Sequence, residues 1–258
     1  VSSWQEAGCR LRKFLLSEIA LSTYQSIASR AGVIRLGAAV QTSIGYVSGA
    51  NEFFHLRPSE AKNYGIPNRL FRIAIRRARQ LPRESVTVRD VKRWLSQDEQ
   101  VLLLNLAGVG IKNIPPAVSA YLETERGYEV RKAYKCRNRD PWYAVPDVKT
   151  PDGFLSYMSG VKPVIVQNAA RCVCANSVHA VFEKNGVSIS EIQKVWSHPL
   201  VDLSCELEGH PLGGGMLKLE PREASNVLIP IDCPTFTEME IKTLKEATIE
   251  MRHWRNYA

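Results

Sequence analysis

Cysteine is scarce in this sequence, and long apolar runs are missing. The 258 residues include six cysteines, which is too few for a disulfide-stapled scaffold in a chain of this length. No apolar run approaches the ~20 residues that a membrane-spanning helix needs. Val1 is not an initiator methionine, and no basic segment followed by an apolar one opens the chain, so a secretory signal is not indicated. We therefore expect a fragment or processed chain that is cytoplasmic, has no membrane partner, and keeps its thiols reduced.

Sequences typical of common cofactor and hydrolase sites are also missing. The run Gly213-Gly214-Gly215 lacks the G-K-[ST] sequence and the strand–helix context of a phosphate loop. Glycine there permits a bend or a close backbone approach instead. No G-x-S-x-G sequence accompanies His179, so a hydrolase is not indicated.

The pair Cys172 and Cys174, with His179 nearby, invites a zinc interpretation. One residue separates the two cysteines, whereas zinc ligands are usually two to four residues apart and accompanied by a second pair. The surrounding sequence V-I-V-Q-N-A-A-R-C-V-C is typical of a strand. We predict buried thiols and no metal site.

Positive charge is present in excess, but in only one half of the chain. Residues 1–150 hold 24 Lys and Arg against 13 Asp and Glu, a net charge of +11. Residues 151–258 hold 10 against 13, a net charge of −3. A basic half indicates either a polyanionic partner or the solvated surface of a basic protein.

Periodicity and turn residues predict a mixed α+β fold without the regular βαβ alternation of a complete doubly wound domain. Helices are expected over residues 3–31, ended by Gly32; over 117–126, ended by Gly127; after the capping box of Ser188 and Glu191; over 199–208, ended by Gly209; and from the capping box of Thr235 and Glu238 through Trp254. Strands are expected within residues 33–56, 69–81, 101–106, 142–145, 163–167, 178–182 and 216–219. The core should lie within residues 33–230, so deleting residues 235–258 should leave a folded, less stable protein.

Four stretches of sequence follow one another in a characteristic order. They are S-I-G-Y-V-S-G-A-N-E-F-F (residues 43–54), C-R-N-R-D-P-W-Y (136–143), V-I-V-Q-N-A-A (164–170) and H-P-L-G-G-G-M-L-K-L-E-P (210–221). In order and spacing this resembles the C-terminal target-recognition region of adenine-N6 (class I) DNA methyltransferases of restriction-modification systems. The resemblance covers roughly residues 36–230.

The resemblance implies a strand-rich target-recognition domain with flanking helices and no complete Rossmann-like catalytic domain. We predict a lead-in helix or connector over residues 1–32, the recognition domain over 33–234 and a C-terminal helix over 235–258. The parent enzyme should use S-adenosylmethionine and flip a target adenine out of double-stranded DNA. No cofactor loop is visible in this chain. Its expected partners are therefore duplex DNA and a methyltransferase catalytic domain, in the same polypeptide or in a partner subunit.

Basic and amide side chains are the candidate DNA-binding residues. Lysine and arginine meet phosphates, arginine can also contact guanine bidentately, and asparagine can read adenine. Asn168, Gly213 and Gly214 match motifs of the resembled family, with structural roles as their alternative. The predicted DNA-binding residues are Arg76, Arg77, Arg79, Lys132, Lys135, Arg137, Asn138, Arg139, Asn168, Gly213 and Gly214.

Two other functions stay open at this point. One is a stand-alone nucleic-acid-binding or regulatory protein. The other is a divergent, self-sufficient methyltransferase that uses Asp140-Pro141-Trp142-Tyr143, which differs at one position from the D-P-P-Y motif of adenine methyltransferases. Basic residues rather than a buried strand precede this tetrapeptide. The resemblance instead assigns Arg139, Pro141, Trp142 and Tyr143 to an R-x-P-W-Y signature of the recognition domain, and we predict no catalytic residue in this chain.

Overall fold

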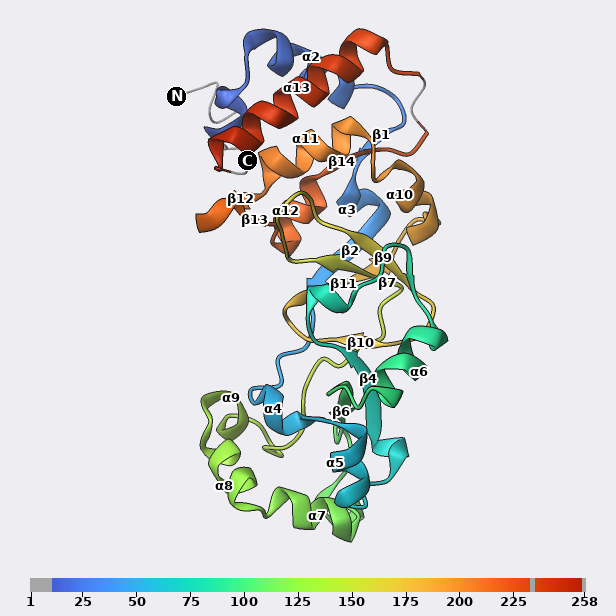
Figure 1. Cartoon of the computed structure of the whole chain (residues 1–258), viewed down its shortest axis with the longest axis vertical. Helices are drawn as coiled ribbons and strands as arrows, with labels where there is room; N and C mark the ends of the chain where they lie inside the picture. Colours follow the sequence, from blue (N-terminus) through green and yellow to red (C-terminus); the bar gives the residue numbers. More distant parts are fainter. Residues whose placement is uncertain (1–10, 233–234, 257–258) are drawn as a thin grey trace. The chain divides into compact units, whose positions relative to one another are not determined.

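The computed structural model describes residues 11–232 and 235–256 (Figure 1). The chain folds into two compact units that alternate along the sequence. Unit 1 contains Val1–Ser43, Leu155–Gln167 and Val181–Ala258, and unit 2 contains Ile44–Phe154 and Asn168–Ala180. Helices and several small sheets occur throughout, so the predicted mixed α+β class is confirmed. No helix in the described part of the chain is long and apolar enough to cross a membrane.

Unit 1 combines helices with short strands. Its helical segments are η1 (Leu11–Leu15), α2 (Glu18–Ala28), α3 (Leu36–Ala39), α10 (Ile189–Val195), α11 (Pro199–Glu208), η5 (Gly213–Gly215), α12 (Pro221–Asn226) and α13 (Glu238–Trp254). Its strands are β1 (Val33–Arg35), β8 (Met158–Ser159), β12 (His210–Pro211), β13 (Leu217–Lys218) and β14 (Leu228–Pro230). The chain passes from one unit to the other within β2 (Val40–Ile44), β7 (Gly153–Ser156), β9 (Ile165–Asn168) and β11 (Val178–Glu183).

Two apolar clusters hold unit 1 together. In the first, α2, α11 and α13 pack through Ile27, Leu203 and Leu244, which are fully buried. In the second, α10 and α11 cover strands ordered β2-β11-β7-β9. Tyr24 donates a hydrogen bond to the Ser204 hydroxyl at 3.1 Å inside the helical cluster, which satisfies a phenol that burial would otherwise penalise.

A buried ion cluster joins the end of α13 to the rest of unit 1. The Arg255 guanidinium donates to both carboxylate oxygens of Glu206 on α11, at 2.8 Å each. It also donates to the backbone carbonyls of Gly215 and Gly160. The Gly213–Gly215 turn is therefore held in place by Arg255, the first residue after α13, in a contact between residues 40 positions apart.

Unit 2 is built on a four-stranded sheet with the order β10-β4-β6-β3. Its strands are β3 (His55–Leu56), β4 (Phe71–Ile75), β5 (Ser85–Val86), β6 (Leu102–Leu104) and β10 (Val173–Cys174). Its helical segments are α4 (Asn51–Phe54), α5 (Pro58–Asn63), η2 (Asn68–Leu70), η3 (Ala78–Gln80), α6 (Val88–Ser96), η4 (Ile111–Asn113), α7 (Pro116–Leu122), α8 (Glu125–Lys132) and α9 (Tyr134–Arg137). One cluster that includes Phe53, Phe54 and Leu103 forms its core.

Several predicted elements are confirmed, because their signals are local. Ser188 and Glu191 form the expected capping box of α10, and α11 runs from Pro199 to the residue before Gly209. Strands occur in six of the predicted segments: β1, β2 and β3 within 33–56, β4 within 69–81, β6 within 101–106, β9 near 163–167, β11 near 178–182 and β13 within 216–219. The lead-in segment is helical as η1 and α2 over its described part.

Three predictions of local structure are wrong. Residues 142–145 form a turn rather than a strand. The last capping box uses Thr237 and Glu240, two residues later than predicted. Gly127 lies inside α8 instead of ending a helix. It is needed there for close packing, because a Cβ at this position would come within 2.1 Å of the carbonyl oxygen of Leu122. The glycine allows close packing between α7 and α8.

Candidate nucleic-acid interface

The net positive charge of the chain lies in unit 2. Unit 2 holds 20 Lys and Arg against 12 Asp and Glu, whereas unit 1 holds 14 of each. The sequence showed an excess of positive charge in its N-terminal half, and in the fold this excess belongs to unit 2. A body with this charge attracts polyanions at distances beyond direct contact.

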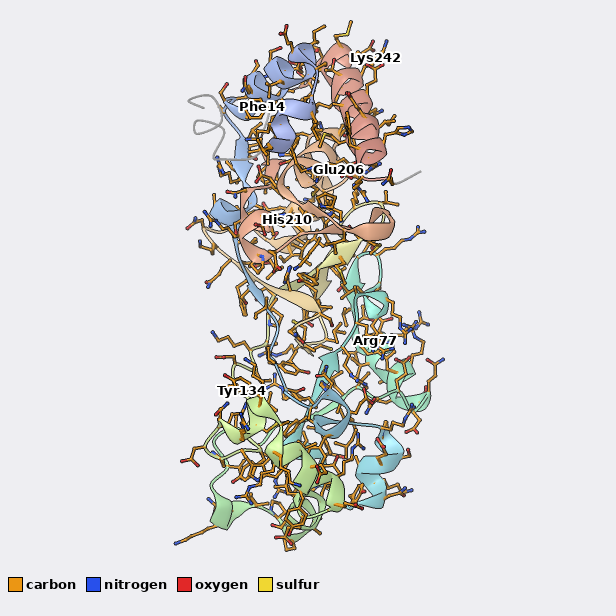
Figure 2. All side chains as sticks on the ribbon, turned by 90° about the vertical axis from the view of Figure 1, so that its left-hand side faces the viewer. Phe14, Arg77, Tyr134, Glu206, His210 and Lys242 are labelled. Carbon is orange, nitrogen blue, oxygen red and sulfur yellow. The ribbon has the colours of Figure 1, made fainter. Side chains whose placement is uncertain are left out.

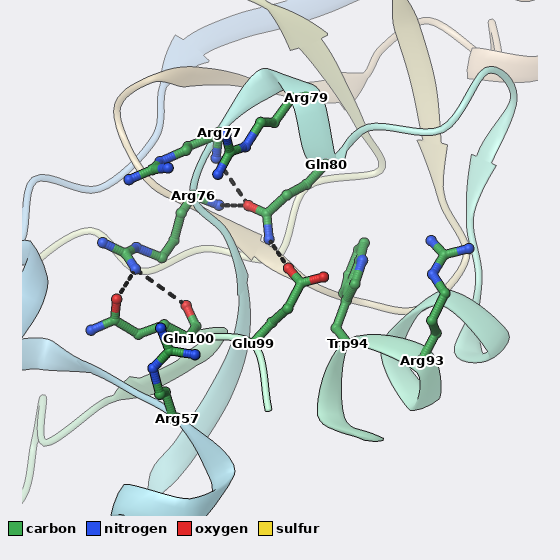
Figure 3. Close-up of a pocket in the computed structure, with 9 residues that line it drawn as sticks. All are labelled: Arg57, Arg76, Arg77, Arg79, Gln80, Arg93, Trp94, Glu99 and Gln100. Carbon is green, nitrogen blue, oxygen red and sulfur yellow. Dashed lines mark hydrogen bonds between the residues drawn. The ribbon is translucent and has the colours of Figure 1, made fainter. Parts of the chain in front are cut away.

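Arginines gather around one cavity of about 490 Å³ in unit 2 (Figure 3). The residues that line it are Arg57, Arg76, Arg77, Arg79, Gln80, Arg93, Trp94, Glu99 and Gln100. They come from the N-cap of α5, the β4–η3 turn, α6 and the segment before β6. Five guanidinium groups face one carboxylate among these residues, so the cavity is strongly electropositive.

The turn after β4 presents two of these arginines to solvent. The Gln80 side-chain oxygen accepts hydrogen bonds from the backbone N–H groups of Arg76 and Arg77, at 2.8 and 3.1 Å. These bonds close the turn around η3. Arg77 and Arg79 are exposed, and within the described residues their guanidinium groups have no hydrogen-bond or ion-pair partner. Both are available to an anionic ligand.

Arg76 has a different role, because its side chain is already occupied. It pairs with Glu52 at 2.5 Å and donates to the Gln100 side-chain oxygen. Gln100 in turn donates to the backbone carbonyl of His55 at 2.7 Å. The hydrogen bond from Arg76 lowers the pKa of Glu52. Arg76 therefore fixes the floor of the cavity and supplies a positive charge that is ordered in advance.

The remaining arginines of the cavity are tethered at one end. Arg57 donates to the backbone carbonyl of Asp98 at 2.8 Å, and Arg93 donates to the Asp90 carboxylate at 3.0 Å. Each guanidinium carries five N–H donors, so one tether leaves donors for a ligand. Sequence reasoning missed Arg57, Arg93 and Trp94, because only the fold brings α5 and α6 to the β4 turn.

A second basic group surrounds α9. Lys135 and Arg137 lie over the ring of Tyr134, at 5.8 and 5.5 Å from its centroid, and both are exposed. On the preceding helix, Lys132 pairs with Glu129 at 2.7 Å. Figure 2 shows Arg77 and Tyr134 on opposite sides of unit 2. The predicted basic residues thus form two separate surfaces.

Two predicted base readers next to α9 make hydrogen bonds within the protein. The Asn138 side chain donates to the Tyr134 carbonyl at 2.8 Å, which satisfies an orphan carbonyl at the end of α9. Arg139 donates to the carbonyls of Val47 and Ser48, both at 2.6 Å. Arg139 thus ties residues 47 and 48 to the end of α9, while Asn138 closes the end of that helix.

Asn168 is a buried organising residue. Its amide nitrogen donates to the carbonyls of Pro151 and Cys172, at 2.7 and 2.8 Å, and its oxygen accepts from the Cys172 N–H at 2.9 Å. Gly214, in unit 1, has a left-handed backbone with φ of 71°, while Gly213 and Gly214 have open space where a Cβ would stand. The turn therefore needs glycine for its backbone at position 214.

The aromatic residues of the R-x-P-W-Y signature belong to the core of unit 2. Tyr143 is buried, with its hydroxyl 3.4 Å from the Val109 carbonyl. The half-buried Trp142 packs against Phe53 and Phe54, with ring centroids 6.1 and 6.5 Å apart. Asp140 is exposed. The rings pack against other rings, and the tetrapeptide serves here as a structural anchor.

The cysteine pair consists of buried thiols, as predicted. Burial raises the pKa of both Cys172 and Cys174 to about 12, and the Cys174 thiol donates to the Val178 carbonyl at 3.6 Å. Within residues 11–232 and 235–256, no group of three or more His, Cys, Asp or Glu side chains is placed to hold a metal ion.

The sequence matches a known family over most of its length. The sequence model of the family described as "Type II methyltransferase M.Eco57I, C-terminal domain" matches residues 10–255. The chain belongs to this family. The chain is also 25% identical over 183 residues to the "Type II methyltransferase M.AccI" of Acinetobacter calcoaceticus, a match that covers 69% of the chain and 33% of M.AccI.

The fold of the chain is similar to part of a solved structure, that of the type IIG restriction endonuclease BpuSI. The TM-score is 0.53 at 12% identity, and the match covers 96% of this chain and 33% of BpuSI. At that identity the likeness concerns the fold alone. The chain thus spans about a third of each of these two relatives. The predicted resemblance to the C-terminal region of a restriction-modification methyltransferase is confirmed.

Proposed function

We propose that this chain is the sequence-specific DNA recognition domain of an adenine-N6 DNA methyltransferase of a restriction-modification system. The observation that carries the proposal is the convergence of five arginines on one cavity of unit 2. Two of them, Arg77 and Arg79, are exposed and can meet the phosphates of duplex DNA, which supply affinity and orientation. Membership of a methyltransferase C-terminal-domain family supports DNA as the polyanion.

Methyl transfer in this proposal belongs to another part of the enzyme. The chain corresponds to a third of M.AccI, and the family describes a C-terminal domain. A catalytic domain, in the same polypeptide or in a partner subunit, would bind S-adenosylmethionine and act on adenine N6, as the sequence motifs imply. The setting would be the cytoplasm, where the DNA substrate is found.

The packing of residues 140–143 favours recognition over self-sufficient catalysis. In the adenine methyltransferase motif the aromatic residue stacks on the flipped base. Here Tyr143 is buried in the core of unit 2, and Trp142 packs against phenylalanine rings. Both rings already pack against aromatic rings of unit 2, which favours a structural role over base stacking.

Charge removal at the cavity tests the proposal. We expect the full chain to bind duplex DNA with an affinity that falls steeply with salt, measured by fluorescence anisotropy. Arg77→Ala combined with Arg79→Ala should weaken binding and reduce the slope of log K against log[salt] by about two, since each lost phosphate contact releases about one counterion fewer. The matched control, Lys242→Ala with Lys245→Ala, removes two exposed charges from α13 in unit 1 and should change neither quantity.

Two results would overturn the proposal. One is a wild-type chain that does not bind duplex DNA at low salt. The other is an Arg77 and Arg79 double variant whose affinity and salt slope equal those of wild type. Calorimetry with S-adenosylmethionine adds a second arm: saturable micromolar binding by this chain alone would favour a self-sufficient enzyme.

A further inference from the structure

An unusually exposed aromatic ring stands on the α9 side of unit 2. The Tyr134 side chain is 66% exposed, although tyrosines tend to bury most of their ring. Lys135 and Arg137 both follow it in sequence, and their cationic groups lie over the ring, 5.8 and 5.5 Å from its centroid. The ring therefore stands in a positive local potential while most of its surface stays open.

The short helix that carries this ring is tied to the body of unit 2 at several points. Cys136, in the middle of α9, is fully buried in the core cluster. The side chain of Asn138 donates to the Tyr134 carbonyl, and Arg139 donates to the carbonyls of Val47 and Ser48. A ring on a support ordered in this way loses little conformational entropy when a ligand covers it.

We propose that Tyr134 is a base-stacking residue that takes an unpaired nucleobase of a DNA strand. The proposal rests on the proposed function, since it assumes that the partner is DNA. Two cations over a largely exposed ring suit a single strand, because the long Lys135 and Arg137 side chains can turn aside to meet phosphates while a base covers the ring. The ring reads no hydrogen-bond pattern, so this contact serves any base.

The Tyr134 surface is distinct from the arginine cavity. The two lie on opposite sides of unit 2 in the view of Figure 2. The cavity presents guanidinium groups and suits phosphates, whereas α9 presents an exposed ring with two cations over it and suits a base with its flanking phosphates. They therefore contact different segments of the bound DNA: the cavity takes duplex phosphates, and Tyr134 takes a strand whose bases are unpaired.

Two single-stranded probes separate stacking from phosphate binding. The first is a short oligo(dA), and the second is a strand of equal length made only of abasic residues, which keeps the phosphates and lacks the bases. Tyr134→Ala should raise the Kd for oligo(dA) by roughly 5- to 150-fold and leave the Kd for the abasic strand unchanged. The salt slope should stay at its wild-type value because no charge is lost. Tyr134→Phe, which keeps the ring, should bind like wild type.

A matched control and a duplex measurement make the result decisive. Tyr64 is another exposed tyrosine of unit 2, at 45%, and Tyr64→Ala should leave oligo(dA) affinity unchanged. The Tyr134 assignment is wrong if Tyr134→Ala binds oligo(dA) like wild type, if it weakens both probes alike, or if wild type does not prefer oligo(dA) to the abasic strand. If wild type still binds duplex DNA through Arg77 and Arg79 in those cases, only the Tyr134 assignment fails. Loss of all duplex binding by wild type would instead refute the proposed function.

Discussion

Two arginines that are two positions apart, Arg137 and Arg139, differ in what surrounds them. Arg137 is exposed beside Tyr134, whereas Arg139 is half-buried and donates to the carbonyls of Val47 and Ser48. Hydrogen bonds from a charged donor contribute about 1.5–3 kcal/mol to stability each. At the residue scale, one arginine can serve a ligand while the other holds the protein together.

Substitution of each arginine should separate these roles. Arg139→Ala should lower the free energy of unfolding by about 2–3 kcal/mol, since two part-buried carbonyls lose a charged donor. Arg137→Ala should leave stability unchanged but weaken the binding of single-stranded oligo(dA) and lower the salt slope of that binding by about one. Urea unfolding and anisotropy measure the two effects. Equal stability of Arg139→Ala and wild type would show that the contacts of Arg139 are dispensable.

His55 makes the stability of unit 2 depend on pH. It is fully buried, and burial lowers its pKa to about 4. Its Nδ1 lies 2.8 Å from the Asn51 carbonyl and its Nε2 lies 2.7 Å from the Tyr46 hydroxyl. Because a carbonyl only accepts, Nδ1 carries the proton and Nε2 accepts from Tyr46. The neutral ring thus satisfies both partners, and protonation disrupts the arrangement.

The sign of the pH effect follows from the lowered pKa. An unfolded histidine titrates near 6.5, so between pH 6.5 and about 4 the unfolded chain binds more protons than the folded one. Stability should fall by roughly 3 kcal/mol as pH drops through this window. His55→Gln should be less stable at pH 8 but should lack this part of the decline. The exposed His253→Gln is the control, and urea unfolding at several pH values is the measurement. A decline of the same size in His55→Gln would exclude His55 as its cause.

At the scale of elements, α13 is part of the core of unit 1. Leu244, Ala247 and Met251 face α2 and α11 in the helical cluster. The buried Glu206 carboxylate depends on Arg255, which follows α13. The sequence pattern suggested a helix added to a complete core, whereas this packing makes the helix a component of it.

Removal of residues 235–258 should therefore abolish the cooperative unfolding transition of unit 1, the opposite of the expectation from sequence. Arg255→Ala isolates one part of the effect and should cost about 3–5 kcal/mol, because it leaves Glu206 buried without its main partner. Glu206→Leu combined with Arg255→Met should be less destabilised than Arg255→Ala, since no buried carboxylate is left without its main partner and the less buried Arg252 and Arg12 lose only their contact with Glu206. A truncated chain with wild-type urea and thermal transitions would contradict the assignment of α13 to the core.

At the scale of the whole molecule, charge and fold divide along the same boundary. Unit 2 holds the whole net charge of +8, while the charges of unit 1 cancel. The sequence could not show this division, because each unit is assembled from separate stretches of the chain. A linear count placed the excess in residues 1–150, which also include the first stretch of unit 1, residues 1–43.

The sequence by itself determined those features that depend on residues close together along the chain. Capping by Ser188 and Glu191, the start of α11 at Pro199 and the apolar strand at Leu102–Leu104 need only local residues, and the order of motifs was sufficient to predict the family. Only the tertiary structure decided what depends on long-range packing. It placed Arg57 and Arg93 beside the β4 turn, put Trp142 among aromatic rings and kept Gly127 inside a helix. These outcomes depend on contacts between segments far apart in sequence. The free energy of such contacts exceeds the local conformational preference of the residues involved.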